Sequence, residues 1–236
     1  TESLDRTAIF IGGSDVAAGE ELLEQVTNSF FGPIRVSVMM DANGANTTAA
    51  AAVLAVSRHV DLSASNCLVL AATGPVGQRV VRLLAREKAH VRVASRKMDR
   101  AERVCQEIQE QVADARLTPV QTDSIDELKE AVDGVQVIVA AGMASIMLLP
   151  EEVRSQCQSL QVVIDLNAVP PLGVEGVEVT ARQENQNGAI CYGAIGVGGT
   201  KMKIHLESIR RLFTSNDLVL DAEEVFAIGQ DLEANQ

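Results

Sequence analysis

The residues whose types and spacing suggest chemistry most directly form the loop from Ala72 to Gly77, which reads A-T-G-P-V-G and follows an apolar run. A dinucleotide-binding loop places G-x-G-x-x-G between a strand and a helix, and here alanine takes the first glycine slot. Gly74 would let the backbone approach a pyrophosphate, Gly77 would let the helix lie close to the sheet, and the helix N-terminus would offer N–H groups to phosphates. Taken alone, the loop is better explained as a tight turn without a ligand. The candidate cofactor-binding residues of this loop are Thr73, Gly74, Pro75, Val76 and Gly77.

The end of the next predicted strand carries a second signal, the run Ser95-Arg96-Lys97. NAD-specific enzymes place a carboxylate on the ribose diol about 20 residues after the glycine loop. A carboxylate would repel a 2′-phosphate, whereas a hydroxyl and a guanidinium would bind one. A solvated basic turn is the alternative. The two features together predict NADP as the cofactor, with NAD left open.

Two further glycine-containing turns fit the nicotinamide end of such a cofactor. Ala141 and Gly142 follow the fourth predicted strand of the nucleotide-binding sheet, and Gly196 lies in a glycine-rich strand-to-helix turn at 193–199. Both turns would suit close backbone approach to the ring, and both fit ordinary turns equally well.

A polar loop after an earlier strand holds the other candidate ligand groups. It lies at the carboxyl end of a strand, where ligands bind in α/β folds. Its amides and hydroxyls can read the donor and acceptor edge of a ligand, although Asn46 or Thr47 could instead cap the following helix. The candidate residues are Asp41, Asn43, Asn46, Thr47 and Thr48.

Strands alternating with helices must position these loops. The first part of the chain predicts strands at 7–11 and 34–40, a helix capped by Ser14 or Asp15 that runs to about 30, and a helix at 48–59. After a polar hinge at 61–66, the predicted strands are 67–71, 90–94, 118–121, 135–140, 162–165 and 190–192. The helices between them are predicted to end near 88 and to span 99–113, 124–132 and 150–157, and the last two helices to span 200–213 and 221–232. This order predicts an α/β protein with a Rossmann-type doubly wound parallel sheet, plus a smaller α/β domain completed by the C-terminal helices.

Charge and composition exclude several classes of protein. Twenty Lys and Arg against 32 Asp and Glu give a net charge of −12, which argues against a nucleic-acid partner. Aromatic residues are only 3% of the chain, which argues against base-stacking platforms. We therefore expect the ligand to be held by backbone, amides and aliphatic walls.

The cysteines and the apolar runs point to a reducing compartment. Cys67, Cys105, Cys157 and Cys191 are scattered without a C-x-x-C pair, so we expect buried free thiols and no metal site. No apolar run reaches the length of a membrane span, and the start of the chain has no signal-peptide layout. We expect a cytoplasmic homo-oligomer with no membrane partner.

Several longer stretches carry a family resemblance: 7–20, 30–51, 69–79, 165–177 and 193–205. The specific motifs are DANGANTT from Asp41 and GAIGVGGTKMK from Gly193. Over essentially the whole chain the sequence resembles the bacterial methylene-tetrahydromethanopterin dehydrogenases. The resemblance implies a pterin-side domain at 1–62, an NADP-binding domain at 63–199 with a cleft between them, and C-terminal helices at 200–236 that return to the first domain. Family members carry a further segment ahead of the first strand, and we expect that segment to be missing here.

The resemblance also implies an activity: hydride transfer from N5,N10-methylene-tetrahydromethanopterin to NAD(P)+, giving the methenyl compound. No proton need move, so the lack of an acid–base pair is expected. Lys201 matches the motif lysine of the family and is the candidate catalytic residue, orienting the pterin carbonyl or binding an anionic group; a surface lysine is the alternative. The polar loop and Asn167 would contact the pterin or shape the cleft wall, whereas His59, His90 and His205 are expected to be structural.

Other functions remain open at this stage. One is a methylene-tetrahydrofolate dehydrogenase or a shikimate-type NADP dehydrogenase with the same architecture, and another is a catalytically silent NADP-binding regulator. A shikimate-type enzyme would use a lysine in an acid–base pair, which makes Lys201 the residue that separates these alternatives.

Overall fold

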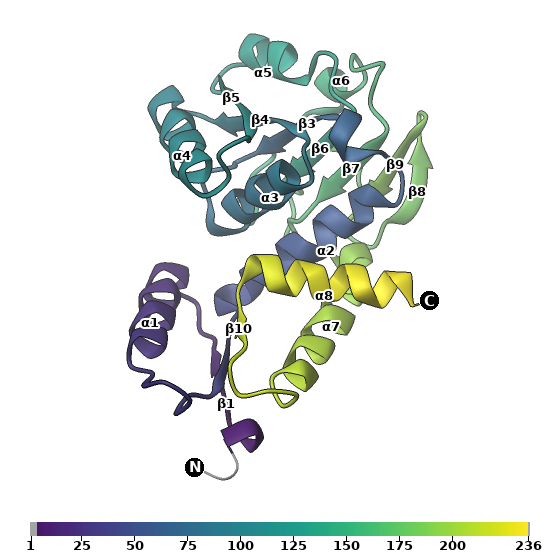
Figure 1. Ribbon diagram of the computed structural model, residues 1–236. Coiled ribbons are helices and arrows are strands. Elements are labelled where there is room, and N and C mark those ends of the chain that lie inside the picture. The colour runs from purple at the N-terminus through teal and green to yellow at the C-terminus, as the bar shows by residue number, and fades with distance from the viewer. Residues whose placement is uncertain (1–3, 236) are drawn as a thin grey trace. The chain divides into compact units, whose positions relative to one another are not determined.

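The computed structural model describes residues 4–235, which divide into two compact units (Figure 1). Unit 1 consists of the described residues up to Ala51 together with those from Thr200 onward, and unit 2 is Ala52–Gly199. Both crossings between the units fall in helices, within α2 (Ala45–Ser57) and within α7 (Ala194–Arg211). Among the described residues, no helix is both long enough and apolar enough to cross a membrane.

Unit 1 is built on a small parallel sheet with the strand order β1-β2-β10. The strands are β1 (Ala8–Ile11), β2 (Ser37–Met40) and β10 (Val219–Leu220). The two-residue strand β10 comes from the far end of the chain and pairs with β2, so the C-terminal segment completes this sheet. The predicted sheet lacked β10, because two residues are too short to show a strand pattern.

Two helix starts in unit 1 follow the predicted caps. Helix α1 (Val16–Asn28) begins after Asp15, whose Oδ1 accepts the N–H of Ala18 at 3.1 Å. Helix α8 (Ala222–Ala234) begins after Asp221, whose N–H donates to Glu224 Oε2 at 3.0 Å. Asp15 caps an unpaired N–H of the first helical turn with its side chain, whereas at Asp221 the first-turn glutamate reaches back to the N–H of the cap residue.

The segment after β2 differs from the prediction. A short 3₁₀ helix occupies Ala42–Gly44, and α2 begins at Ala45 rather than near Thr48. The prediction of a polar loop through residue 48 is therefore wrong, and Asn46, Thr47 and Thr48 lie in the first turns of α2. The reason is a cap from ahead of the usual capping position: Asp41 Oδ1 accepts the N–H of Thr47 at 3.1 Å.

Unit 2 is a seven-stranded sheet with the order β5-β4-β3-β6-β7-β9-β8, parallel except for β8. Its strands are β3 (Asn66–Leu70), β4 (His90–Ser95), β5 (Arg116–Gln121), β6 (Val137–Ala140), β7 (Val162–Asp165), β8 (Arg182–Gln186) and β9 (Ala189–Tyr192). The chain leaves β3 toward β4 and β5 and returns on the other side at β6, so it reverses direction across β3. This confirms the doubly wound fold and places the switch point, where such folds bind ligands, beside β3.

Helices cover both faces of this sheet. They are α3 (Pro75–Arg86), α4 (Met98–Gln111), α5 (Ile125–Val132) and α6 (Glu151–Arg154). Figure 1 shows α5 and α6 together on one side of the sheet and α3 on the other. The central strands β3, β6 and β7 are apolar runs with buried residues on both faces, as expected of a covered parallel sheet.

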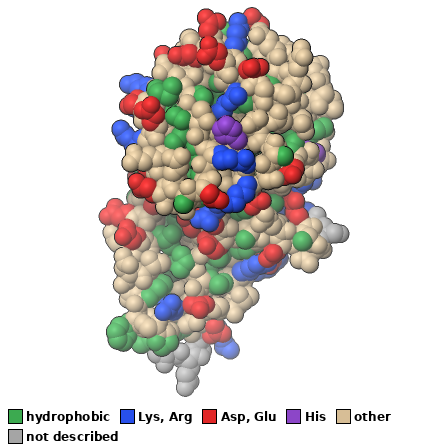
Figure 2. All heavy atoms as spheres, turned by 45° about the horizontal axis from the view of Figure 1, so that its top comes forward, with side chains coloured by type: hydrophobic (Ala, Val, Ile, Leu, Met, Phe, Trp, Pro, Cys, Tyr) green, Lys and Arg blue, Asp and Glu red, His purple; other side chains and the backbone are tan. Residues whose placement is uncertain are grey.

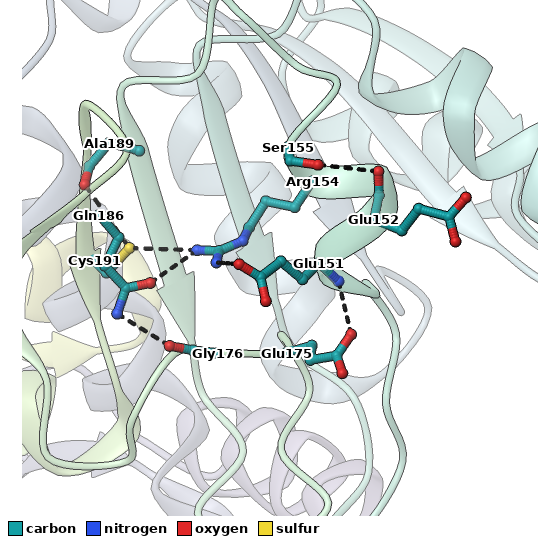
Figure 3. A network of polar contacts seen from close by, with 9 residues as sticks. All are labelled: Glu151, Glu152, Arg154, Ser155, Glu175, Gly176, Gln186, Ala189 and Cys191. Carbon is teal, nitrogen blue, oxygen red and sulfur yellow. Dashed lines mark hydrogen bonds and ion pairs between the residues drawn. The ribbon is translucent and has the colours of Figure 1, made fainter.

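Strand β8 is an edge strand that the prediction lacked, because its sequence RQENQ has no apolar alternation and most of it is exposed. A buried arginine ties it to the rest of unit 2 (Figure 3). Arg154 Nη1 donates to Gln186 Oε1 at 3.0 Å and lies 3.8 Å from Cys191 Sγ. Gln186 Nε2 in turn donates to the carbonyl oxygen of Gly176 at 3.0 Å. The network therefore joins α6, β8 and β9 through polar groups that sequence patterns do not reveal.

Helix α7 also begins earlier than predicted. The predicted glycine-rich turn at 193–199 is wrong from Ala194 onward, because the glycines after it lie inside the helix. A Cβ atom on Gly196 would overlap the carbonyl oxygen of Ala181. Glycine at this position therefore lets the start of α7 lie directly against neighbouring backbone.

All four cysteines are buried and free, as predicted. Burial raises the pKa of Cys67 to about 12 and, with Glu102 nearby, that of Cys105 to about 11. Burial also raises the pKa of Cys191, although Arg154 partly offsets this effect.

These thiols should be unreactive in the native protein. Only a thiolate attacks a disulfide reagent, and at pH 8 Cys67 and Cys105 stay protonated with such raised pKa values, while burial shields Cys157 and Cys191 from the reagent. We expect the native protein to react slowly with dithionitrobenzoate at pH 8 and all four thiols to react at once in denaturant. A fast native thiol would contradict this burial.

Candidate functional site

The loop after β3 has the geometry of a nucleotide-binding turn. Helix α3 begins at Pro75 with Gly74 as its N-cap, so the loop passes directly from strand end to helix start. A Cβ atom on Gly77 would lie 2.8 Å from both the carbonyl oxygen of Ala71 and the Cα of Ala72. Gly77 thus allows the close contact between helix and strand expected of the last glycine in such a loop.

The same loop is held by its own hydrogen bonds. The N–H of Gly74 donates to the carbonyl of Ala71 at 3.2 Å, and Gln78 Nε2 donates to the carbonyl of Thr73 at 3.0 Å. Pro75 is exposed, whereas Thr73 and Val76 are half-buried. The first N–H groups of a helix have no partner within the helix, so those of Val76 and Gly77 are suited to an anion.

The turn after β4 presents free cationic groups. Ser95 is buried, and its Oγ accepts the N–H of Lys97 at 3.3 Å. Arg96 and Lys97 are exposed, and within residues 4–235 neither side chain has a hydrogen-bond or ion-pair partner. Because β4 is paired with β3 in parallel, this turn and the glycine loop follow the carboxyl ends of adjacent strands.

Positive charge on unit 2 is local rather than general. Figure 2 shows a file of Lys and Arg side chains across the face turned to the viewer, with Asp and Glu on either side of it. In a chain of net charge −12, Arg96 and Lys97, which are exposed and have no carboxylate partner among the described residues, are the natural place for a phosphate.

The remaining predicted cofactor residues have mixed surroundings. The N–H of Ala141 donates to the carbonyl of Leu70, which brings the end of β6 beside the end of β3. A Cβ atom on Gly74 would lie 3.9 Å from the carbonyl oxygen of Ala141, and Gly142 is half-buried next to it. Gly196 instead packs against Ala181, which accounts for glycine there without a ligand.

The side chain of Asn167 makes its hydrogen bonds within its own loop. It is buried; its Nδ2 donates to the carbonyl of Pro171 at 3.1 Å, and its Oδ1 accepts the N–H of Val169 at 3.0 Å. The backbone N–H of Asn167 also donates to Asp165 at the end of β7 at 2.9 Å. These bonds favour a loop-shaping role for Asn167 over contact with a ligand.

Sequence reasoning missed Asp165, which organises this loop. Both carboxylate oxygens accept backbone N–H groups, from Asn167 and from Val174, at 2.9 Å each. Burial raises the pKa of Asp165, and these backbone hydrogen bonds oppose the shift. The signal in the sequence was an acidic residue closing an otherwise apolar strand.

In unit 1, the carboxylate of the predicted ligand residue Asp41 also accepts hydrogen bonds from within the fold. Its side chain is only 3% exposed, and its two oxygens accept the backbone N–H and the Oγ1 hydroxyl of Thr47, the latter at 2.8 Å. Thr47 itself is fully buried. Asp41 and Thr47 therefore fold the segment at 41–47 and do not present free groups to a ligand.

The other polar residues of this segment differ in availability. Asn46 is fully buried and its Nδ2 donates to the carbonyl of Met40 at 2.6 Å and to Asp221 Oδ1 at 2.8 Å, joining β2 to the start of α8. Asn43 is exposed and Thr48 half-buried, and among the described residues neither side chain has a polar partner. Asn43 and Thr48 thus keep the free groups that a ligand could use.

Two side chains of α7 face this segment. A Cβ atom on Gly44 would overlap Lys201 Nζ, so the lysine lies directly over the turn at Gly44. One turn later, His205 Nδ1 lies 3.6 Å from Asp41 Oδ2. The i, i+4 spacing places both on one side of the helix, so His205, which the sequence analysis expected to be structural, lies beside the candidate Lys201.

The other two histidines lie in unit 2. His59 Nε2 lies 2.8 Å from the hydroxyl of the buried Tyr192, and burial, together with Arg58, lowers the pKa of His59. The ring nitrogens of His90 lie 3.2 Å from Asn66 Oδ1 and 2.9 Å from Thr118 Oγ1. Both rings are held by neighbouring side chains within the fold.

Comparison with known families assigns both parts of the chain. Residues 1–43 match the model described as "Methylene-tetrahydromethanopterin dehydrogenase, N-terminal". Residues 71–211 match the model described as "NAD(P)H-binding". The second match covers the glycine loop, the turn after β4 and all of α7.

Curated relatives match along nearly the whole chain. The "Bifunctional protein MdtA" of Methylorubrum extorquens is 40% identical over 96% of this chain and 79% of its own length. The "NAD(P)-dependent methylenetetrahydromethanopterin dehydrogenase" of the same organism is 25% identical over 96% of this chain and 80% of its own. Among solved structures, the A chain of dipicolinate synthase from Bacillus subtilis has a TM-score of 0.53 at 21% identity, over 99% of this chain and 69% of that one. That last likeness supports the fold alone.

Proposed function

Since this chain belongs to the methylene-tetrahydromethanopterin dehydrogenase family, we propose that it takes a hydride from N5,N10-methylene-tetrahydromethanopterin to give the methenyl compound, with NADP+ as acceptor. The observation that carries the proposal is the 40% identity to a family member over 96% of the chain. We propose unit 2 as the nucleotide side and unit 1 as the pterin side, which places the first boundary between them within α2, at residues 51/52, and not at 62/63.

The residues of unit 2 fit the cofactor. The N-terminus of α3 with Thr73 to Gly77 would hold the pyrophosphate, and Ala141 and Gly142 would border the nicotinamide end. The exposed, unpartnered Arg96 and Lys97 would bind a 2′-phosphate, which favours NADP over NAD. Bound NADP+ supplies the hydride acceptor.

The residues of unit 1 have a binding task rather than an acid–base task. The reacting carbon of the substrate lies between two nitrogens, and the lone pair of one nitrogen can drive the hydride out without proton transfer. The chain must then orient the pterin and exclude water. Lys201, Asn43 and Thr48 carry the free polar groups that could do so, with Lys201 placed over Gly44.

The experiment that tests the proposal follows NADPH absorbance with methylene-tetrahydromethanopterin and methylene-tetrahydrofolate, each with NADP+ and NAD+. We expect turnover to be fastest with the methanopterin carrier and NADP+. Turnover with the folate carrier alone would favour the folate dehydrogenase, and no turnover with either carrier would favour a nucleotide-binding regulator.

Replacing Lys201 with alanine tests its role as an orienting group. Loss of one charged hydrogen bond of about 1.5–3 kcal/mol should raise the pterin KM roughly 10- to 100-fold, with a smaller loss of kcat. Lys203, exposed on the same helix, provides the matched control, and its alanine variant should behave as wild type. Complete loss of kcat with an unchanged KM would instead indicate the acid–base lysine of a shikimate-type enzyme.

We also propose that the protein acts as a cytoplasmic homo-oligomer. The surface of α7 supports an oligomer, because Met202 and Leu206 lie one turn apart on this helix and Phe213 follows just past its end, and the three side chains are 52, 51 and 50% exposed. Apolar side chains aligned in this way are typical of surfaces that another chain covers. Sedimentation of the purified protein would measure the state.

A further inference from the structure

The two ring nitrogens of His205 have different surroundings. Nδ1 lies 3.6 Å from Asp41 Oδ2, and the side chain is 30% exposed. Within the described part of the chain, Nε2 has no hydrogen-bond partner. One edge of the ring therefore faces a carboxylate oxygen, while the other has no polar neighbour among the described residues.

Asp41 can fix the orientation of this ring because it is fixed itself. Thr47 donates two hydrogen bonds to its carboxylate, at 3.1 and 2.8 Å, and the side chain is almost completely buried. A carboxylate beside one ring nitrogen favours the proton on that nitrogen and leaves the other as an acceptor in the neutral ring. Asp41 thus presents Nε2 of His205 as an acceptor.

An aromatic side chain lies next to the same ring. Phe10 of β1 is 47% exposed, and its ring meets His205 edge to face, with centroids 5.7 Å apart and planes at 87°. Lys201 lies one turn earlier on α7, over Gly44. Phe10, His205 and Lys201 together border the carboxyl ends of β1 and β2, which is the edge where α/β sheets bind ligands.

We propose that His205 is a substrate-contacting residue, whose Nε2 accepts a hydrogen bond from a ring N–H or amino group of the pterin while Phe10 packs against the flat ring system. Asp41 acts through His205 as a positioning residue. The inference rests on the proposed function and names a specificity determinant within it. It also corrects the expectation of an aliphatic wall, because one of the few aromatic rings of the chain lies at this edge.

The chemistry of the three groups is complementary. A lysine ammonium can only donate hydrogen bonds, so Lys201 suits the pterin carbonyl. The pyrimidine edge of a pterin also carries N–H donors, which require an acceptor. Since Asp41 is almost completely buried and both of its oxygens accept hydrogen bonds from Thr47, the unpartnered nitrogen of His205 supplies that acceptor.

Two substitutions separate contact with the substrate from support of the fold. In His205→Gln the amide can occupy the position of Nε2, whereas in His205→Asn it replaces Nδ1 and retains only the contact with Asp41. We expect His205→Asn to raise the KM for methylene-tetrahydromethanopterin about tenfold, the effect of one hydrogen bond, and His205→Gln to stay within about threefold of wild type. The KM for NADP+ should not change in either variant.

The outcomes decide between the two roles. The proposed contact is overturned if the pterin KM of His205→Asn equals that of the wild type, whether the KM of His205→Gln is raised or also unchanged. If both variants show a raised pterin KM together with a lowered melting temperature, the variant Phe10→Leu decides. A raised pterin KM at the wild-type melting temperature in Phe10→Leu supports the inference, and an unchanged KM overturns it.

Calorimetric titration with methenyl-tetrahydromethanopterin separates this inference from the proposed activity. If the wild type binds the pterin without reducing NADP+, the proposed activity fails, yet weaker binding by His205→Asn than by His205→Gln still supports the contact. If the wild type binds no pterin, the inference fails as well.

Discussion

Replacing Gly196 with alanine is expected to destabilise the protein by about 3 kcal/mol, the upper end of what overpacking costs. The added methyl group would overlap the carbonyl oxygen of Ala181, which belongs to backbone and not to the tip of a flexible side chain. Relief would require the start of α7 to move away from the neighbouring loop. Thermal or urea unfolding of the variant measures this cost.

Gly198 provides the control within the same helix. A Cβ atom there would have no atom within 4 Å, and alanine is favoured over glycine inside a helix by up to about 1 kcal/mol. We expect Gly198→Ala to leave stability unchanged or to raise it. Equal unfolding midpoints for the two variants would show that Gly196 is not constrained by packing.

The sequence predicted the framework of unit 2 well because its signals are local. The apolar run of β3, the glycine loop and the start of α3 lie within a few residues of one another, and Gly77 has the close contact that its place in the motif requires. The caps at Asp15 and Asp221 were predictable for the same reason, since each bonds a group three residues away.

The features that were not predicted depend on contacts outside the usual short-range sequence patterns. Strand β8 is polar and exposed, and it is held by pairing with β9 and by Arg154. The start of α2 is set by Asp41 and not by a residue at the usual capping position. In the candidate pterin site, sequence reasoning assigned ligand contact to Asp41 and a structural role to His205, but the burial of Asp41 and the free Nε2 of His205 favour the reverse.

Replacing Arg96 with alanine is expected to change the preference between the two nucleotides. The guanidinium is exposed and unpartnered in the described structure, so its removal costs no internal contact. Charged hydrogen bonds to the 2′-phosphate of about 1.5–3 kcal/mol would be lost, which should raise the KM for NADP+ roughly 10- to 100-fold. The KM for NAD+, which lacks that phosphate, should stay the same.

Arg100 is the matched control. It lies four residues after Arg96, in the first turn of α4, and its side chain is also exposed without a polar partner among residues 4–235. Arg100→Ala should leave the ratio of the two KM values unchanged. Because exposed charges are screened by salt, the wild-type KM for NADP+ should rise with ionic strength more steeply than that of Arg96→Ala. An unchanged ratio of the two KM values in Arg96→Ala would show that Arg96 does not bind the phosphate. If the KM for NADP+ of that variant still rose with ionic strength as in the wild type, Lys97, the other free cation of this turn, would be the group that binds the phosphate.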